Sequence, residues 1–479
     1  MCRPDTSVTA KQSSSAAAAA ADASATLNVK LSKEDEWLKS FDYEGFTTEI
    51  RELGKKLSAA QDQSDVDHLN YMILWSNICA AVGLLTMGFI RYNPISILGL
   101  SLYAFTRWTM IAHHTCHGGY ENCHPEAKNR GRWSRFTFGL GTLWRRWNDW
   151  FDWMMPEAWN VEHNNRHHYN LSEITDPDLV EQNSQTIREM QAPMFLKYLN
   201  VSALVVTWKW MYYAPNTYKE LKLAHMRRTG QVIPSHIESE QPVLIGSIIK
   251  SILSGGKIYP EATYFYSLFE LLTVVLLPYL VIHFFITPLP WLLVGKYMGA
   301  ATEDDSIDTT YYWNAVVNLF IAELLTNAHG FLAVVTNHAG DDMYRFRKPC
   351  RPFSGSFYLR QVLASVDYDM GTNLVDFLHG WLNYQIEHHM WPNLSMKQYQ
   401  ISAPQVKAIC NKYGVPYVQE NVFKRLKKTT DIMVGKTSMR WFPEQYEDLF
   451  LELDAIAERK AFDEKTSKIN SIKEDKKEK

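Results

Sequence analysis

The sequence predicts an all-α integral membrane protein with four transmembrane helices and a helical cap on the cytosolic side. Three observations support this: four long apolar stretches, a charge distribution that differs between the connecting segments, and an aromatic content of 13% with 16 Trp among 479 residues. Trp and Tyr concentrate at membrane–water interfaces, where one end of the ring is apolar and the other is wet. We expect a disordered N-terminal tail over residues 1–40, one membrane domain over 41–450 and a charged C-terminal tail over 451–479.

The four expected spans are apolar stretches long enough to cross a bilayer. The stretch from Asn70 to Ile90 contains no charged residue, and about 20 apolar residues cross about 30 Å of hydrocarbon. The second stretch is broken only by Arg107, and the fourth carries only Glu323. The apolar segment 194–213 is too short to cross and is expected to be an interfacial helix. The expected spans are 70–90, 95–112, 271–295 and 312–335.

The charges of the connecting segments predict the orientation. Four spans place both termini and the long central segment on the same side. The loop after the third span holds Lys296 with four acids, whereas most Lys and Arg lie in 113–260 and in the C-terminal region, which the positive-inside rule places in the cytosol. Six Cys without a C-x-x-C pair argue against a disulfide framework and fit a reducing compartment. The net charge of −3 predicts no nucleic-acid partner.

Seven of the 16 His fall into three tight groups, all on the expected cytosolic side. In the first group, His113 and His117 are four residues apart just beyond the second span, so both imidazoles leave one helix face and can reach one metal. The third group is the pair His388 and His389, preceded by Gln385.

The middle group consists of His163, His167 and His168. In a continuous helix, His163 and His167 would share a face, whereas His168 would point about 100° away and could reach a second metal. Imidazoles packed together repel one another when protonated and need a cation to bind.

The number of nitrogen ligands predicts more than one metal. Imidazole suits Zn, Cu, Fe and Ni, and there are too many nitrogens for one four-coordinate zinc. No thiolate cluster accompanies them. A pair of irons with four or five nitrogens each would use the set well. The residues alone therefore predict a dinuclear polyhistidine site beside a bilayer.

Together, the three groups resemble the histidine boxes of the membrane fatty acid desaturases. Those boxes read HxxxH or HxxxxH, HxxHH or HxxxHH, and (H/Q)xxHH, and the resemblance covers roughly residues 70–450. It implies a di-iron site held by the cytosolic cap, with two non-haem Fe ions. The ligands that it implies are His113, His117, His163, His167, His168, His388 and His389.

The resemblance also implies a further ligand from the end of the fourth span. The pair Asn337-His338 is similar to an Asn-His pair at this place in the family, so His338 is the expected ligand. His329 lies about 13 Å further along the helix, too far to reach the same metal.

The third box, DFLHGWLNYQIEHHMWP, resembles the front-end branch of the family, in which Gln replaces the first His; here that residue is Gln385. This branch inserts a double bond between an existing one and the carboxyl end. The second box departs from this branch, because the branch usually has HxxHH and this sequence has HxxxHH. The His-Pro-Gly-Gly mark of a fused b-type cytochrome domain is replaced by His124-Pro125-Glu126, so we expect a separate electron donor.

The expected function is therefore that of a fatty acyl desaturase, which uses O2 and two irons to introduce a cis double bond into an acyl-lipid or acyl-CoA. The electron donor would be a free b-type cytochrome with its reductase, or ferredoxin. A sphingolipid desaturase and a fatty acyl hydroxylase are alternatives on the same scaffold. A histidine-rich metal transporter is the non-catalytic alternative, although transport favours ionisable residues within the spans.

The expected location is a multi-pass position in the endoplasmic reticulum membrane. The C-terminal Lys476-Lys477-Glu478-Lys479 resembles a dilysine retrieval signal, which works at a cytosolic C-terminus. The Ser- and Ala-rich N-terminus keeps a plastid membrane as the alternative.

Overall fold

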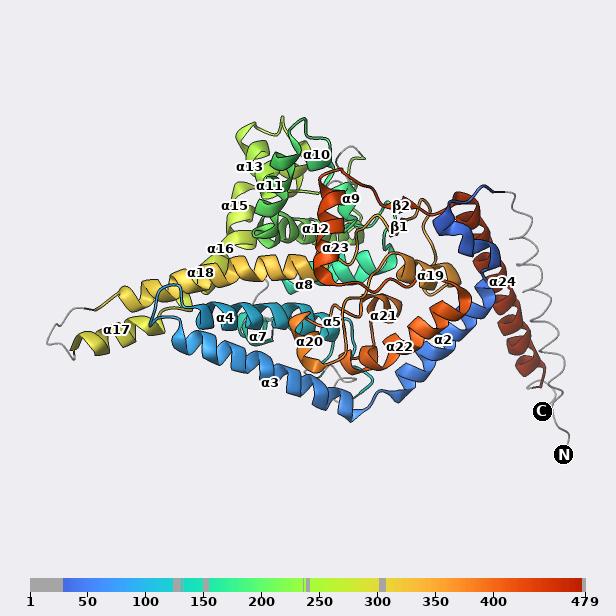
Figure 1. Ribbon diagram of the computed structural model, residues 1–479, viewed down its shortest axis with the longest axis horizontal. Coiled ribbons are helices and arrows are strands. Elements are labelled where there is room, and N and C mark those ends of the chain that lie inside the picture. The colour runs from blue at the N-terminus through green and yellow to red at the C-terminus, as the bar shows by residue number, and fades with distance from the viewer. Residues whose placement is uncertain are drawn as a thin grey trace.

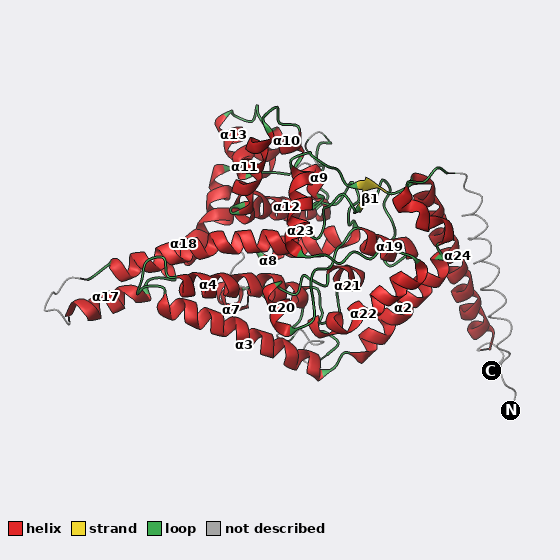
Figure 2. Cartoon of the chain, viewed as in Figure 1, coloured by secondary structure: helices red, strands yellow, loops and turns green. Residues whose placement is uncertain are grey.

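The computed structural model describes residues 29–123, 131, 133–149, 155–235, 237, 242–300 and 307–475. The chain is mostly helical (Figure 2). A two-residue parallel ladder is an exception to the expected all-α class: β1 (Tyr344–Arg345) pairs with β2 (Arg440–Trp441). The expected N-terminal tail lies outside the described residues as far as residue 28, and so do Lys476 and Lys477.

The structure contains four helices that are long and apolar enough to cross a membrane, as the sequence predicts. Their bounds are Gln63–Thr86, Pro94–Cys116, Leu268–Met298 and Thr310–Val335. Figure 1 shows α3, α4 and α18 running side by side, with α17 at the end away from the cap. The elements of these spans are α3 (Gln63–Thr86), α4 (Pro94–Thr106), η2 (Arg107–Ala112), α5 (His113–Cys116), α15 (Leu268–Glu270), η6 (Leu271–Leu276), α16 (Leu277–Val281), η7 (Ile282–Ile286), α17 (Pro290–Ala300), α18 (Thr310–Gly330) and η8 (Phe331–Val335).

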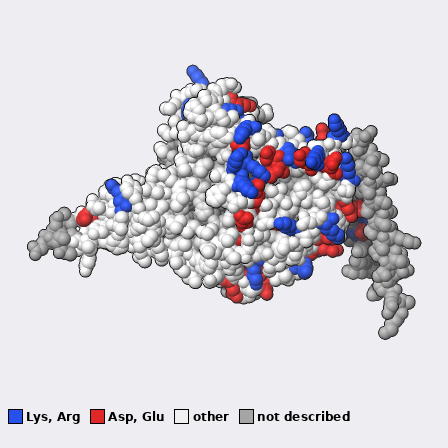
Figure 3. Space-filling model, viewed as in Figure 1, with Lys and Arg blue, Asp and Glu red and all other residues white. Residues whose placement is uncertain are grey.

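The outer surface of these helices is apolar. In α3, Leu85 is 70% exposed, and in α17 Leu293 is 72% exposed. Figure 3 shows that the visible face over α3, α4 and α18 carries almost no charged side chain, whereas charges gather over the rest of the molecule. An apolar surface of this extent on long helices matches the hydrocarbon core of a bilayer. The protein is therefore a membrane protein.

Specific turns and contacts set the helix ends. A capping box at Asp62 and Asp65 begins α3, and Asn93 caps α4 with Pro94 in its first turn. Asn318 of α18 binds the turn between α3 and α4, because its amide donates to the carbonyls of Met87 and Ile90 at 2.7 and 2.8 Å.

Several helices change to π-helical winding close to histidines. The π segment η2 ends where His113 begins, η3 (Asn160–Asn164) contains His163, and η8 ends three residues before His338. Extra residues of this kind inside helices are rare and are frequent at functional sites.

The remaining elements form a cap over the end of the spans opposite α17, and part of the cap, with α10, α11 and α13, extends along α18 (Figure 1). Its N-terminal and C-terminal parts pack on each other, since the rings of Tyr43 and Phe450 stack at 4.6 Å. Residues 33–40, within the expected tail, form a 3₁₀ helix with Leu38 buried, and the expected C-terminal tail continues α24 as far as Asp475. The cap elements are η1 (Lys33–Ser40), α2 (Tyr43–Ala60), α7 (Leu143–Asp149), α8 (Pro156–Trp159), η3, η4 (His167–Tyr169), α9 (Val180–Asn183), α10 (Gln185–Arg188), α11 (Met194–Val205), η5 (Lys209–Tyr213), α12 (Ala214–Arg228), α13 (Ile245–Leu253), α14 (Pro260–Phe265), α19 (Gly355–Leu363), α20 (Asn373–Leu378), α21 (Gln385–Met390), α22 (Met396–Tyr413), α23 (Val422–Met433) and α24 (Glu444–Asp475).

Candidate metal centre

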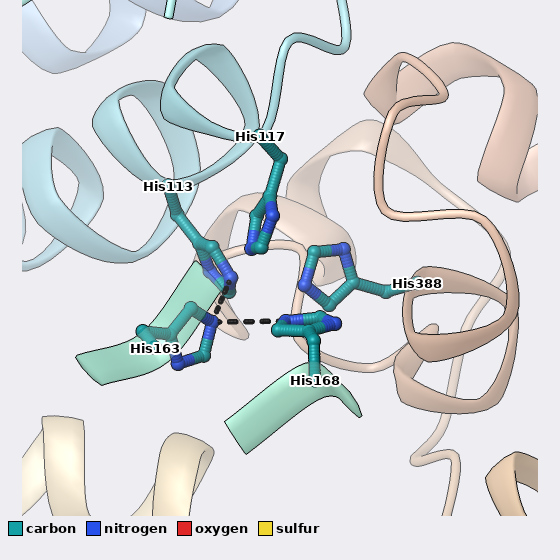
Figure 4. A group of neighbouring side chains, drawn as sticks. All are labelled: His113, His117, His163, His168 and His388. Carbon is teal, nitrogen blue, oxygen red and sulfur yellow. Dashed lines mark hydrogen bonds between the residues drawn. The ribbon is translucent and has the colours of Figure 1, made fainter. Parts of the chain in front are cut away.

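Five buried histidines from three distant parts of the chain converge on one point; this is the five-histidine group. Their candidate ligand atoms all lie within 4.8 Å of one another. Figure 4 shows the rings facing a common centre from α5, from the η3–η4 segment and from α21. The Nε2 atoms of His163 and His113 are 2.9 Å apart, and those of His168 and His163 are 3.1 Å apart. The members are His113, His117, His163, His168 and His388.

The other three expected ligands form the three-histidine group, which consists of His167, His338 and His389. Gln385 adjoins it, because its Nε2 lies 2.9 Å from Nε2 of both His338 and His389. The two groups are neighbours, since the rings of His168 and His389 stack with centroids 4.2 Å apart. All eight expected histidines are thus brought together, with Gln385 beside them.

The middle box divides differently from the sequence prediction. His163 lies with His168 in the five-histidine group, whereas His167 lies with the other three-histidine members. The expectation that His163 and His167 share a metal-facing side, with His168 apart, assumed a continuous α-helix. The π turn of η3 and the break before η4 rotate the later residues, so a spacing of five residues directs His163 and His168 to the same point.

The distances within the groups fit metal coordination. At a metal–nitrogen distance of about 2.0–2.1 Å, two imidazole nitrogens would be about 3.0 Å apart at right angles and about 3.3 Å apart in a tetrahedron. The separations of 2.9 and 3.1 Å lie close to these values. Among the described residues, Nε2 of His117 and Nε2 of His388 are buried without a hydrogen-bond partner. Buried polar atoms of this kind call for a ligand.

Gln385 can offer oxygen to the second group. Its Oε1 is buried without a hydrogen-bond partner among the described residues. An amide exchanges its nitrogen and oxygen by a half-turn, so the carbonyl oxygen can take the place of Nε2 beside His338 and His389. Three imidazoles and one amide oxygen then form a four-atom donor set.

Partners on the outer ring nitrogens fix the orientation of several imidazoles. The Nδ1 atom of His167 lies 2.9 Å from Oδ1 of Asp176, and Nδ1 of His113 lies 3.1 Å from the carbonyl of Thr109. The Nδ1 atom of His388 lies 3.3 Å from the Tyr399 hydroxyl. Contacts of this kind hold the ring in place and keep Nε2 available as the ligand atom.

Burial keeps most of these imidazoles neutral. Burial, followed by the neighbouring histidines, holds the pKa values of His168, His388 and His389 well below the usual histidine range. A neutral imidazole is the form that binds metal. For His167, burial also lowers the pKa, but the Asp176 carboxylate outweighs it, and the net pKa is raised.

Two carboxylates beside the site were not foreseen. Asp176 binds His167, and Asp178 joins His163 and His167 in a third set of candidate ligand atoms. Both acids lie in the stretch Thr175-Asp176-Pro177-Asp178, which begins seven residues after His168, the last residue of the middle box. That proximity was the available signal, but a loop sequence does not show toward which ring its carboxylates turn.

A cavity of about 570 Å³ reaches the histidines. Five site residues line it: His113, His163, His167, His338 and Gln385. Its other walls are largely apolar and include Phe331, Val334 and Leu204. Ligand cavities commonly have this size and lining.

Other histidines near the boxes stay outside both groups. His329 stacks on Phe105 at 3.8 Å, and its Nε2 lies 2.7 Å from the Leu378 carbonyl. His114 turns its Nδ1 to the Met110 carbonyl at 2.6 Å, and His379 turns its Nδ1 to the Val375 carbonyl at 2.8 Å. His124 lies outside the described residues.

Fold and site together define a membrane protein with a buried polyhistidine centre compatible with metal. Residues 88–421 match the fatty acid desaturase family, and the chain belongs to that family. The two groups of buried histidines are compatible with a metal centre in a protein of this family.

Curated relatives match over shorter regions. The chain is 29% identical over 122 residues to an NADPH-dependent stearoyl-CoA 9-desaturase of Mycobacterium tuberculosis, covering 25% of this chain and 28% of the relative. It is 26% identical over 111 residues to Delta(5) fatty acid desaturase A of Dictyostelium discoideum, covering 22% and 24%. It is 33% identical over 121 residues to a Delta 8-(E)-sphingolipid desaturase of Lachancea kluyveri, covering 24% and 20%. These matches span less than a third of each relative, and no solved structure matches the chain.

Proposed function

We propose that this protein is a fatty acyl desaturase that uses O2 and two non-haem irons to introduce a cis double bond. The observation that carries the proposal is the apolar cavity that reaches two adjoining groups of buried histidines. The five-histidine group would hold one iron, and the three-histidine group with Gln385 would hold the other. The family membership supports the same assignment.

The proposed reaction breaks two C–H bonds on neighbouring methylenes and forms one C=C bond. The two hydrogen atoms removed, together with two electrons and two protons from the donor system, reduce O2 to two waters. The bound irons would supply, with O2, the oxidising power that unactivated C–H bonds require.

The chain itself would select the reacting carbons by position. The apolar walls, among them Val334 and Leu204, would hold an extended acyl chain and exclude water. Because the cavity fixes which methylenes lie beside His163 and His338, its length on each side of the histidines would set the position of the new bond.

We further propose front-end regioselectivity, in which the new bond forms on the carboxyl side of an existing one. The support is the Gln385 box and the similarity to a relative named as a Delta(5) fatty acid desaturase. The longer middle box is compatible with this assignment, because the π turn at η3 brings His163 and His168 to one point despite the extra residue.

The proposed environment is the endoplasmic reticulum membrane, with the cap and both histidine groups in the cytosol. The support is the positive charge of the central segment and the terminal dilysine pattern. A free b-type cytochrome with its reductase would then deliver the electrons, and ferredoxin would do so if the protein resided in a plastid.

Lipid analysis of a yeast strain that expresses the chain tests the function. We expect cis double bonds on the carboxyl side of existing ones, located by mass spectrometry of derivatised lipids. His225→Ala should leave these products unchanged, because this histidine contacts Arg228 away from both histidine groups. New bonds only in saturated chains or toward the methyl end would refute the front-end proposal. Hydroxylated chains or altered sphingoid bases would identify the alternative reactions, and unchanged lipids would refute the desaturase proposal.

A further inference from the structure

The acyl cavity has an aromatic deep end within the membrane-spanning helices. On the fourth span, its lining reaches from His338 through Val335 and Val334 to Phe331, about 10 Å along the helix axis. On the second span, the lining ends at Trp108. The rings of Trp208 and Tyr213 also line the cavity; they lie 5.0 Å apart, and each lies 5.7 Å from the Trp108 ring. We call Trp108, Trp208, Tyr213 and Phe331 the aromatic end.

Trp208 and Tyr213 of the aromatic end come from outside the four spans, and Trp208 is the one whose ring lies near both Trp108 and Phe331. It directly precedes η5, and its ring centroid lies 5.7 Å from that of Trp108 and 6.3 Å from that of Phe331. Its position therefore depends on what attaches η5 to the spans.

Asn327 of the fourth span attaches this segment through the backbone and the indole. The Trp208 indole N–H donates to the Asn327 carbonyl at 2.8 Å, and the Lys209 backbone N–H donates to Asn327 Oδ1 at 3.0 Å. The Asn327 amide in turn donates to the Glu323 carbonyl one turn away at 2.8 Å.

The next contact is a buried ion pair. Lys209 Nζ binds the Glu323 carboxylate, and both side chains are 1% exposed. Glu323 lies about 18 Å before the end of the fourth span at 1.5 Å per residue, which places the pair deep in the apolar layer. His283 of the third span approaches the same carboxylate at 3.7 Å.

A lysine at this depth has a large desolvation cost, which its partner offsets only while the two remain in contact. The charge on Lys209 therefore holds the start of η5 at the level of Glu323. Neither the metal ligands nor the proposed reaction requires charges at this place, so the pair calls for another role.

We propose that the Lys209–Glu323 ion pair and Asn327 are positioning residues that hold Trp208 at the deep end of the cavity and thereby limit the length of acyl chain accepted. The inference rests on the proposed function. It assigns the specificity to residues about 16–22 Å along the fourth span from His338.

The test measures the ratio of long to short desaturated products in yeast supplied with unsaturated acids of graded length. This ratio does not depend on how much folded enzyme is present, and the iron content of purified protein controls for changes at the metals. One added methylene in an apolar pocket changes discrimination about 10–200-fold. We expect Glu323→Gln, Lys209→Met and Asn327→Leu each to raise the ratio of long to short products at least about tenfold, for products that differ by two carbons in length. The charge swap Lys209→Glu with Glu323→Lys should restore the wild-type ratio.

Opposite changes at the aromatic end provide a second arm. Trp208→Ala should raise the ratio, whereas Gly330→Ala should lower it. A Cβ at Gly330 would lie 3.1 Å from the Trp108 ring, closer than ordinary van der Waals contact, and would push that ring toward the cavity, whereas the Trp208 ring at 3.6 Å would be in ordinary contact. Lys222→Met is the matched control, because its ion pair with Glu270 lies outside the cavity lining.

Asn327→Leu decides the matter if the charge variants fail to fold, because it leaves no charge without a partner. A wild-type ratio in Asn327→Leu, or the same change in Lys222→Met as in Lys209→Met, would overturn the inference and leave the proposed function intact. If the strain that expresses the wild-type protein gains no new double bond, the proposed function and this inference are refuted together.

Discussion

Asp176→Asn should selectively weaken the metal site formed by the three-histidine group. In the structure, the Asp176 carboxylate lies 2.9 Å from Nδ1 of His167 and accepts backbone N–H groups of Ser172 and Asp178 at 2.8 and 2.9 Å. Losing a carboxylate behind a histidine ligand costs about 10–100-fold in metal affinity. At about 1.4 kcal/mol per factor of ten, this is about 1.4–2.8 kcal/mol.

Competition between the purified protein and a chelator would measure this affinity for each bound iron. We expect one iron to dissociate about 10–100-fold more readily, while the iron of the five-histidine group keeps its affinity. Asp376→Asn is the matched control: Asp376 is equally buried and accepts hydrogen bonds from Asn383 and Gln400, both at 2.6 Å, but it contacts no expected ligand. Equal iron affinity in wild type and Asp176→Asn, or equal losses in both variants, would refute the reasoning.

Three further predictions concern the ligands and the location. His388→Ala and His167→Ala should each abolish product formation while the protein still inserts in membranes; wild-type turnover by either variant would contradict the site. His338→Ala should lose activity and iron. His329→Ala should keep most of both, because the His329 ring stacks on Phe105 and lies in neither histidine group. Iron analysis of the two proteins checks this, and the reverse result would show that the fourth span has another register. Imaging of an internally tagged protein in its own cell should show the endoplasmic reticulum, and envelope fluorescence of a chloroplast would instead indicate ferredoxin as the donor.

The spans and the histidine groups could be predicted from sequence because each depends on local pattern. A stretch such as 70–90, which lacks charge, forms a membrane helix whatever surrounds it. Adjacent or i, i+4 histidines likewise stay close in any helix. The seven box histidines were therefore identifiable before their distances were known, whereas His338 was expected only from the family resemblance, and the structure brings all eight together.

Features that depend on tertiary packing could not be predicted. The π turn that directs His163 and His168 to one group carries no sequence signature, because it arises where neighbouring elements stabilise an extra residue. The partner of Glu323 lies in the segment 194–213, which reads as a separate interfacial helix, and nothing in the sequence connects Lys209 with the fourth span. The contact of Asp176 with His167 depends on how one loop folds back.

The iron content of the active, full-length protein tests the central claim most directly. Purified in membrane mimics after expression that yields new double bonds, it should contain about two irons per chain, with nitrogen-dominated coordination in X-ray absorption. His338→Ala should reduce this to about one iron. An active preparation with one iron or fewer per chain, or with zinc in place of iron, would contradict the account.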